Sequence, residues 1–565
     1  MTDLVAQAGQ NRTALRRPLV DGWSAVAIVL ALLICLPVLT IAGLALSPVT
    51  GIWGHLASTV LPGYVANTLA LLLLVGSGVV VIGTGTAWLV SMCRFPGRRL
   101  FEWALLLPLA CPAYVIAIVY GEMLDYAGWV QIWLRDLFGW TSPADYWFPD
   151  IRTLGGAAAM LTLVLYPYVY LLARAAFLDT SVSALEVART LGLGPRRAFL
   201  RVTLPLARPA IVVGLALALM EVLADFGTVQ IFAVDTFTTG IYDVWLGFND
   251  VHAAGQLAAL LLLFVLLLIS LEMLSRRGRR FHNAGRHYRG LPTLQLRGWR
   301  AWAATTACAL PLGLGFMLPA GVLAHWAAVT GADVRLGDYL SDLTTTVQLA
   351  AMAAVLAVAV AVFLSYAMRL SPRRPLIVAA RVAASGYAIP GPVIAVGVLL
   401  PFAWLDNMVD AAMRAGFGVS TGLILSGTVV ALLFAYLVRF LALSLGSVEA
   451  SLQRVTRNID GAARSLGHGP WRTLWRVHLP MIRGGLLTAA LLVFVDVMKE
   501  LPATLLLRPF NFSTLATRVF EYASDEMFEE TGLWSLSIVA AGILPVLVLS
   551  YAIGRSRPGG AAMDG

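Results

Sequence analysis

Two acidic pairs lie near the ends of two long apolar stretches, where they could contribute oxygen ligands to a polar path. Glu221 and Asp225 form the first pair, and Asp496 and Glu500 form the second pair 275 positions later. Residues four apart share one face of a helix, and carboxylate oxygens suit hard cations. A structural role is an equally good interpretation, because Lys499 could neutralise Asp496 or Glu500 and acids near helix ends can reach an interface.

The other reactive residues do not form a catalytic or metal-binding motif. Lys499 is the only lysine and stands in Met-Lys-Glu-Leu, which excludes a phosphate-binding Gly-Lys-Ser/Thr loop. His468 and His478 lie in a polar segment, where we expect them on a helix surface. No nucleophile, base and acid occur together, so the sequence predicts no enzyme, cofactor or metal site. The cysteines lack C-x-x-C spacing and are expected to act as small hydrophobic residues: Cys35, Cys93, Cys111 and Cys308.

The composition places these residues in a membrane protein. The chain has 565 residues, of which 59% are hydrophobic and 13% charged, and the mean hydropathy is +0.81. Soluble domains are roughly 45–50% apolar and about 25% charged. A spanning helix needs about 20 mostly apolar residues. Twelve spans are predicted, at residues 23–46, 64–92, 101–121, 155–177, 206–226, 254–274, 301–324, 341–368, 376–405, 420–446, 481–501 and 532–554.

The arginines predict the orientation of these spans. If the N-terminus is cytoplasmic, cytoplasmic segments hold 33 arginines and outer segments hold six. This distribution is typical of the excess of positive charge on cytoplasmic loops. Both termini are therefore predicted to be cytoplasmic. The arginine-rich stretch 276–300 is interpreted as a linker and orientation signal, and nucleic-acid binding is not expected.

An internal repeat divides the chain into two halves. Residues 183–205, here called the first repeat segment, align without gaps with residues 458–480, the second repeat segment, and 11 of the 23 positions are identical. A weaker match at an offset of 278 pairs Pro112 with Pro390. The chain is therefore predicted to consist of two six-helix halves, residues 1–290 and 291–565. Each repeat segment lies in a cytoplasmic loop between the fourth and fifth spans of its half.

Each repeat segment is predicted to form a short helix, a glycine turn and a second helix. In the first segment, Ser183 and Glu186 have the spacing of a capping box, and Gly192 and Gly194 can adopt a left-handed stop. Proline then suits the first position of the second helix, and Pro205 is predicted to end that helix. In the second segment, Asn458 is the predicted cap.

The repeat segments resemble the EAA loop of binding-protein-dependent ABC importer permeases (E-A-A, three residues, G, nine residues, I-x-L-P). The second copy has Gly461 where the family has Glu. The resemblance covers nearly the whole chain and implies an all-α type I importer fold of the MetI-like class. It also implies that the segments dock into ATPase subunits through these residues: Glu186, Ala188, Gly192, Gly194 and Pro205, and Ala463, Gly467, Gly469 and Pro480.

This resemblance implies a complete transport machine around the chain. Two copies of a cytoplasmic ATPase would supply energy, and a separate binding protein would deliver substrate on the outer face. The location would be the inner membrane of a bacterium. Residues 224–245 and 496–526 resemble fused two-half permeases of the ferric iron group, whose architecture thiamine and polyamine permeases share. Iron is the expected substrate, thiamine or a polyamine the alternative, and a secondary transporter or membrane enzyme are competing classes.

Overall fold

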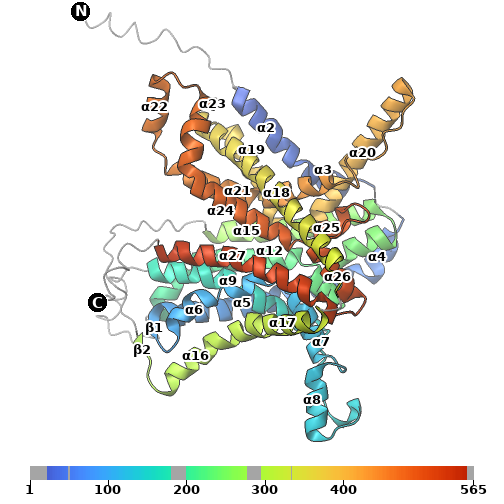
Figure 1. Cartoon of the computed structure of the whole chain (residues 1–565), viewed down its shortest axis with the longest axis vertical. Helices are drawn as coiled ribbons and strands as arrows, with labels where there is room; N and C mark the ends of the chain where they lie inside the picture. Colours follow the sequence, from blue (N-terminus) through green and yellow to red (C-terminus); the bar gives the residue numbers. More distant parts are fainter. Residues whose placement is uncertain are drawn as a thin grey trace, which may run out of the picture. The chain divides into compact units, whose positions relative to one another are not determined.

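The computed structural model describes residues 22–48, 51–179, 197, 199–276, 294–331 and 334–555, and most of these residues are helical (Figure 1). Within the described residues, ten helices are long and apolar enough to cross a membrane, and two bent helix pairs raise that number to twelve. The predicted all-α polytopic fold with about twelve spans is therefore confirmed. Glu186, Ala188, Gly192 and Gly194 lie outside the described residues.

The chain folds into two compact units. The smaller unit takes the described residues up to Leu36, then Ala353–Tyr387 and Tyr436–Val493, and the larger unit takes the rest. These units do not follow the two halves at residues 1–290 and 291–565, which remain a prediction. The smaller unit contains α2 (Gly22–Ile34), α19 (Arg374–Ala383), η6 (Ala384–Ala388), α22 (Arg457–Ser465), α23 (Pro470–Thr473), η7 (Leu474–His478) and most of α24 (Leu479–Met498).

The larger unit holds the remaining elements. In the first half of the chain these are α3 (Leu36–Ala45), α4 (Trp53–Thr59), α5 (Leu61–Met92), β1 (Cys93–Arg94), α6 (Arg98–Ala104), η1 (Leu107–Ala110), α7 (Ala113–Leu124), α8 (Trp129–Phe138), η2 (Pro143–Asp145), α9 (Leu154–Asp179), η3 (Phe199–Thr203), α12 (Leu204–Ala224), α13 (Gly227–Ile231), α14 (Phe237–Tyr242), η4 (Asp243–Gly247) and α15 (Val251–Arg276).

In the second half of the chain the larger unit contains β2 (Leu294–Gln295), α16 (Trp299–Leu312), η5 (Gly313–Met317), α17 (Leu318–Thr330), α20 (Gly391–Phe417), α25 (Pro502–Leu507), α26 (Leu515–Ser524), η8 (Glu529–Thr531) and α27 (Gly532–Arg555). Three long helices, α18 (Leu336–Leu370), α21 (Val429–Gln453) and α24, are divided between the two units. The strands β1 and β2 pair in parallel, with Cys93 opposite Leu294. In Figure 1, α8 projects from the end of α7.

Glycines let three spans of the larger unit approach one another closely. A methyl group at Gly83 of α5 would lie 2.8 Å from the carbonyl oxygen of Tyr166 in α9, and one at Gly214 of α12 would lie 2.8 Å from the Cα of Val169. Small residues permit such backbone contact between helices in membranes, where packing replaces the hydrophobic effect as the driving force. The helices α5, α9 and α12 therefore form a tightly packed group.

Two predicted spans are interrupted at equivalent prolines. The helix pair of the third span bends by 87° between Ala110 and Ala113. The predicted ninth span, residues 376–405, is wrong: its first part forms the separate helix α19, and the span itself is Gly391–Phe417. Pro112 and Pro390 both adopt an extended backbone directly before a helix, with ψ of 146° and 143°. Apolar runs conceal such breaks, because proline disfavours a helical conformation at the residue before it.

The spans that follow the repeat segments begin with the same irregular turn. A π-helical turn at Phe199–Thr203 precedes α12, and another at Leu474–His478 precedes α24 at the same offset of 275. In the second segment, α23 is therefore continuous with the membrane span, as Pro470–Met498. In the first segment, Phe199–Ala224 is one helix that runs past Pro205, so the prediction that the helix ends at this proline is wrong. A wider turn accommodates a proline that cannot donate an N–H group to a regular helical ladder. Pro480 occupies the equivalent position in α24.

Candidate functional site

Asp225 stands where α12 breaks and caps the short helix that follows. Its carboxylate accepts a hydrogen bond of 2.9 Å from the Thr228 hydroxyl and one of 3.2 Å from the Val229 N–H. The Asp225 carbonyl in turn accepts a 2.7 Å bond from the Thr238 hydroxyl at the start of α14. Carboxylates near the first turn of a helix satisfy its free N–H groups and interact favourably with its dipole. The acid therefore holds the break in a fixed geometry.

Glu500 likewise caps the short helix that follows the equivalent break, after α24. Its carboxylate accepts bonds of 3.0 Å from the backbone N–H groups of Ala503 and Thr504, and the Thr504 hydroxyl also contacts it. The side chain is buried, at 5% exposure. The two breaks thus share one design, a carboxylate that caps a short helix (α13 or α25). These contacts favour the structural interpretation of Asp225 and Glu500, and a path-lining role remains a prediction.

The other members of the acidic pairs lie one turn earlier. Asp496 forms an ion pair of 2.9 Å with Lys499, and both side chains are partly exposed. Lys499 therefore pairs with Asp496, which is one of the two partners, Asp496 or Glu500, that the sequence left open. Glu221 is half-buried and has partners of its own. These partly accessible groups remain the better candidates for a polar path.

The two helix breaks contact each other inside the larger unit. Gly227, the first residue of α13, lies so close to α7 and to the second break that an added methyl group would be 2.6 Å from the Cβ of Tyr114 and 2.9 Å from the Cδ2 of Leu501. The rings of Phe226 and Phe520 pack nearby, with centroids 5.5 Å apart. We call Tyr114, Gly227 and Leu501 the break junction. Broken helices at membrane depth are typical of transporter substrate sites.

A pair of threonine side chains caps the start of α14, and an equivalent pair caps the start of α26. Thr236 donates its N–H to the Thr239 hydroxyl at 2.8 Å, and Thr514 donates its N–H to the Thr517 hydroxyl at 2.8 Å. The two Thr-x-x-Thr motifs cap α14 and α26 and are separated by 278 positions. They are absent from the predictions made from the sequence, although their spacing of 278 residues equals that of Pro112 and Pro390.

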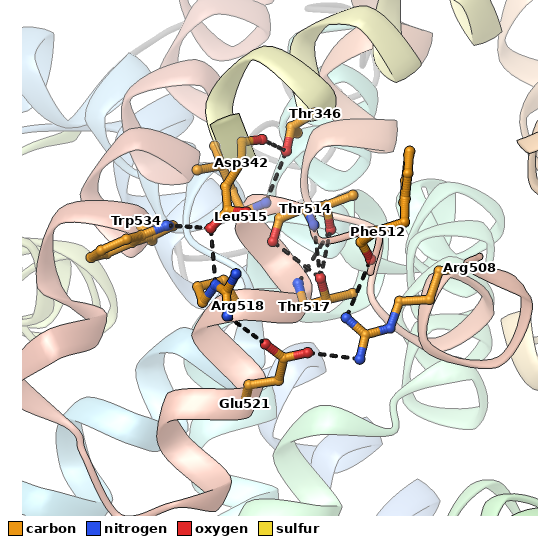
Figure 2. Close-up of polar contacts among 10 residues, drawn as sticks. All are labelled: Asp342, Thr346, Arg508, Phe512, Thr514, Leu515, Thr517, Arg518, Glu521 and Trp534. Atoms are coloured by element: carbon orange, nitrogen blue, oxygen red, sulfur yellow. Dashed lines mark hydrogen bonds and ion pairs between the residues drawn. The ribbon is translucent and has the colours of Figure 1, made fainter. Parts of the chain in front are cut away.

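Figure 2 shows an ion-pair network in which α26 is tied to α18, to α27 and to Arg508, the residue that follows α25. Asp342 of α18, which is buried, accepts bonds of 2.9 Å from the Arg518 guanidinium and 3.1 Å from the Trp534 indole. Glu521 contacts Arg518 at 3.1 Å and Arg508 at 2.7 Å. The hydrogen bond to the Asp342 carboxylate raises the pKa of the Arg518 guanidinium. Sequence reasoning placed both arginines outside but could not find Asp342, 176 residues away.

Replacing Asp342 with Asn should destabilise the protein by about 2 kcal/mol, because the buried indole and guanidinium lose a charged acceptor. The decrease in thermal stability can be measured on the purified protein through tryptophan fluorescence. Asp338→Asn is the matched control, since Asp338 lies one turn earlier on α18 and is exposed. Equal stability of the two variants would show that the network contributes nothing.

The second repeat segment has the predicted helix, glycine turn and helix. The first helix, α22, begins after Thr456, so the prediction that Asn458 is the cap is wrong. Gly467 ends it in a left-handed conformation, with φ of +77°, and the His468 N–H bonds the Ala463 carbonyl at 2.9 Å. Gly469 then precedes α23, whose first residue is proline. Figure 1 shows α22 leading through α23 into α24.

A hub of three charged or polar side chains fixes α22 within the smaller unit. Arg369, at the end of α18, donates to Asp460 of α22 at 2.7 Å and to the carbonyls of Leu452 and Val455 at 2.8 Å each. His478, in the turn before α24, contacts the other Asp460 oxygen at 2.7 Å. We call Arg369, Asp460 and His478 the coupling hub.

His478 corrects an expectation. The sequence predicts that it lies on a helix surface, but its side chain is 0% exposed. The reason is that His478, in the π-helical turn before α24, packs against Asp460 and the ring of Tyr366. Arg369 was missed altogether, since it is 91 residues from Asp460. Among the described residues, the four cysteines are free and buried, and no group of three or more His, Cys, Asp or Glu side chains could hold a metal ion.

Comparisons with known proteins place this architecture in a family. The model of the binding-protein-dependent transport system inner membrane component matches residues 79–280 and 377–556. The Fe(3+)-transport system permease protein FbpB 2 of Haemophilus influenzae is 27% identical over 491 residues, covering 86% of this chain and 88% of that protein.

Two further relatives differ in how much of the chain they cover. The ferric transport system permease protein FbpB of Actinobacillus pleuropneumoniae is 24% identical over 522 residues, covering 88% of this chain and 72% of that protein. The molybdenum transport system permease protein ModB of Escherichia coli is 33% identical over 155 residues, covering 27% of this chain and 62% of that protein. The resemblance to fused ferric iron permeases is thus confirmed, and the chain belongs to the binding-protein-dependent transport system inner membrane component family, whose domain it carries twice.

Proposed function

We propose that this chain is the membrane-spanning subunit of an ATP-driven importer that moves ferric iron into a bacterial cell. The relatives similar to it over most of its length carry ferric transport in their names. Two copies of a cytoplasmic ATPase subunit would bind the two repeat segments, and a separate binding protein would deliver iron on the outer face. Both termini would be cytoplasmic. The chain itself would contribute no enzymatic activity.

The observation that carries this proposal is the direct link between α22 and a helix break. The coupling hub joins α22 to the first turn before α24. The helix α24 then runs without interruption to Met498, next to Glu500 at the break. A displacement of α22 by an ATPase would be transmitted along this rigid helix, because packed elements move as units rather than deforming continuously. The expected result is alternating access at the break junction.

Uptake of radiolabelled ferric iron tests the substrate. Cells that lack this gene should lose most of the uptake, and complementation should restore it without inhibition by excess thiamine or polyamine. Loss of thiamine or polyamine uptake instead, with iron uptake intact, would contradict iron as the substrate. It would leave the proposal of an ATP-driven importer unchanged. Dependence on a proton gradient without ATP would favour a secondary transporter.

Replacing Gly467 with Leu should disrupt docking of the ATPase. Gly467 has φ of +77°, and a residue with a Cβ atom loses about 1–2 kcal/mol in this conformation. We therefore expect the turn after α22 to open, and the ATPase recovered with the purified chain to fall several-fold together with iron uptake. Gly461→Ala is the matched control, because an added methyl group on that residue of α22 meets nothing within 4 Å. Unchanged ATPase recovery with Gly467→Leu would overturn the docking role.

A further inference from the structure

A pocket beside the coupling hub is not used by the proposed transport mechanism. It has a volume of about 440 Å³ and lies in the smaller unit, between the ends of α18 and α21, the helix α19 and the start of α22. Its lining combines arginines with apolar side chains, and one wall is Arg369 of the hub. An occupant of this pocket would therefore contact the residue that holds α22 in place.

The charge of the pocket favours an anion. Three guanidinium groups line it, from Arg369, Arg381 and Arg457, against one carboxylate, from Glu449. Arg381 already neutralises Glu449 through an ion pair of 2.8 Å. Arg369 is committed to Asp460. Arg457, the first residue of α22, is exposed and has no ion pair with the described residues, so its guanidinium is available to an anion.

A buried hydroxyl group points independently to a ligand. Ser365 lines the same pocket, its side chain is only 3% exposed, and its hydroxyl has no hydrogen-bond partner among the described residues. Buried polar groups in folded proteins nearly always have a partner. A phosphate oxygen in the pocket would accept from the Ser365 hydroxyl and from the arginines together.

The rest of the lining distinguishes a lipid phosphate from a free one. Met368, Ile377, Leu452 and Val455 provide an apolar surface next to the guanidinium groups. A soluble phosphate ion makes no apolar contacts with that surface, whereas the glycerol and upper acyl chain of a phospholipid would cover it. Arg369 and Arg381 lie in the last turns of α18 and α19. Basic pockets between helix ends on the cytoplasmic side of a membrane are suited to anionic lipid headgroups.

We propose that this pocket binds the phosphate headgroup of an acidic phospholipid from the cytoplasmic leaflet. The leaflet assignment rests on the orientation given under the proposed function. The headgroup phosphate contacts Arg457, Arg381 and Ser365, and the acyl region contacts the apolar wall. Because Arg369 forms both the pocket wall and the coupling hub, the bound lipid stabilises the position of α22 against α18.

Native mass spectrometry of the purified full-length chain, titrated with phosphatidylglycerol or with phosphatidylcholine, measures this binding directly. The phosphatidylglycerol should be retained in preference to phosphatidylcholine. Arg457→Gln should weaken its retention about tenfold, since one charge-assisted hydrogen bond is lost, and Ser365→Ala should cause a smaller loss. Arg454→Gln is the matched control, because Arg454 is an exposed arginine three residues away that does not line the pocket.

Three results would overturn the lipid site. Equal phosphatidylglycerol retention by Arg457→Gln and Arg454→Gln would place the lipid elsewhere. Displacement of the lipid by inorganic phosphate at comparable concentration would identify a free phosphate site. Equal retention of phosphatidylcholine and phosphatidylglycerol would show that the negative charge of the headgroup does not contribute to binding. Iron uptake is not a readout here, so an error in the proposed substrate leaves this test unaffected.

Discussion

Replacement of Arg369 with Met is expected to reduce iron uptake by more than about tenfold while the protein remains in the membrane. Methionine fills a similar volume but leaves Asp460 without its guanidinium partner and the carbonyls of Leu452 and Val455 without a donor. Removing one member of a largely buried ion pair costs about 3–5 kcal/mol. The side chain of Arg369 is 11% exposed, so solvent compensates little of this loss.

The measurement is uptake normalised to the amount of folded protein, with ATPase activity of the purified complex followed in parallel. We expect ATP hydrolysis to persist without transport, because α22 can still dock but no longer moves α24. Arg414→Gln is the matched control, since the Arg414 side chain is 63% exposed in its ion pair with Asp410 and exposed pairs contribute little. Wild-type uptake by the Arg369→Met variant would contradict the role of the coupling hub.

Replacement of Gly227 with Ala is expected to have the second large effect. The added methyl group would lie 2.6 Å from the Cβ of Tyr114 and 2.9 Å from the Cδ2 of Leu501. The Tyr114 Cβ is fixed to its backbone and cannot move aside, so α13 must shift. Overpacking of this kind costs about 1–3 kcal/mol. We expect a lower melting temperature and iron uptake reduced several-fold.

Gly247→Ala provides the comparison, because an added methyl group at Gly247 meets nothing within 4 Å. Thermal unfolding and uptake would be measured for both variants in the same membranes. If Gly227→Ala matches Gly247→Ala in both measurements, the break junction tolerates extra volume. The close contact between the two breaks would then have no part in transport.

The repeat made much of the fold predictable from sequence. An offset of 275 relates the acidic pairs and the repeat segments, and the structure has matching helix breaks and π-helical turns at that offset. The left-handed glycine at Gly467 follows from local chemistry, since a helix commonly ends in that conformation. Such features depend on residues close together in the chain, so their spacing is informative.

Other features could not be predicted, because they depend on partners distant in the chain. Arg369 and Asp460 are 91 residues apart, and Asp342 and Arg518 are 176 apart. The break within residues 376–405 lies in a mostly apolar stretch. Gly386 lies at this break, and a methyl group there would lie 2.1 Å from the Val438 carbonyl oxygen. Periodicity measures apolar content and does not report which backbone approaches which.

For the buried acids too, the sequence predicted their positions but not their role. Sequence spacing placed Asp225 and Glu500 at equivalent positions near helix ends, but it left their function open. In the structure, both carboxylates accept hydrogen bonds from backbone N–H groups of short helices. This arrangement depends on the exact point at which each span breaks, and an apolar composition does not specify that point.

The most direct test of the account is transport by the purified complex in vesicles. The chain would be reconstituted with its ATPase and supplied with the iron-loaded binding protein, and accumulation of radiolabelled iron would be measured with and without ATP. The account predicts iron accumulation that requires both ATP and the binding protein and that is unaffected by thiamine or polyamine. Accumulation of iron without ATP, or of thiamine or a polyamine in place of iron, would contradict it.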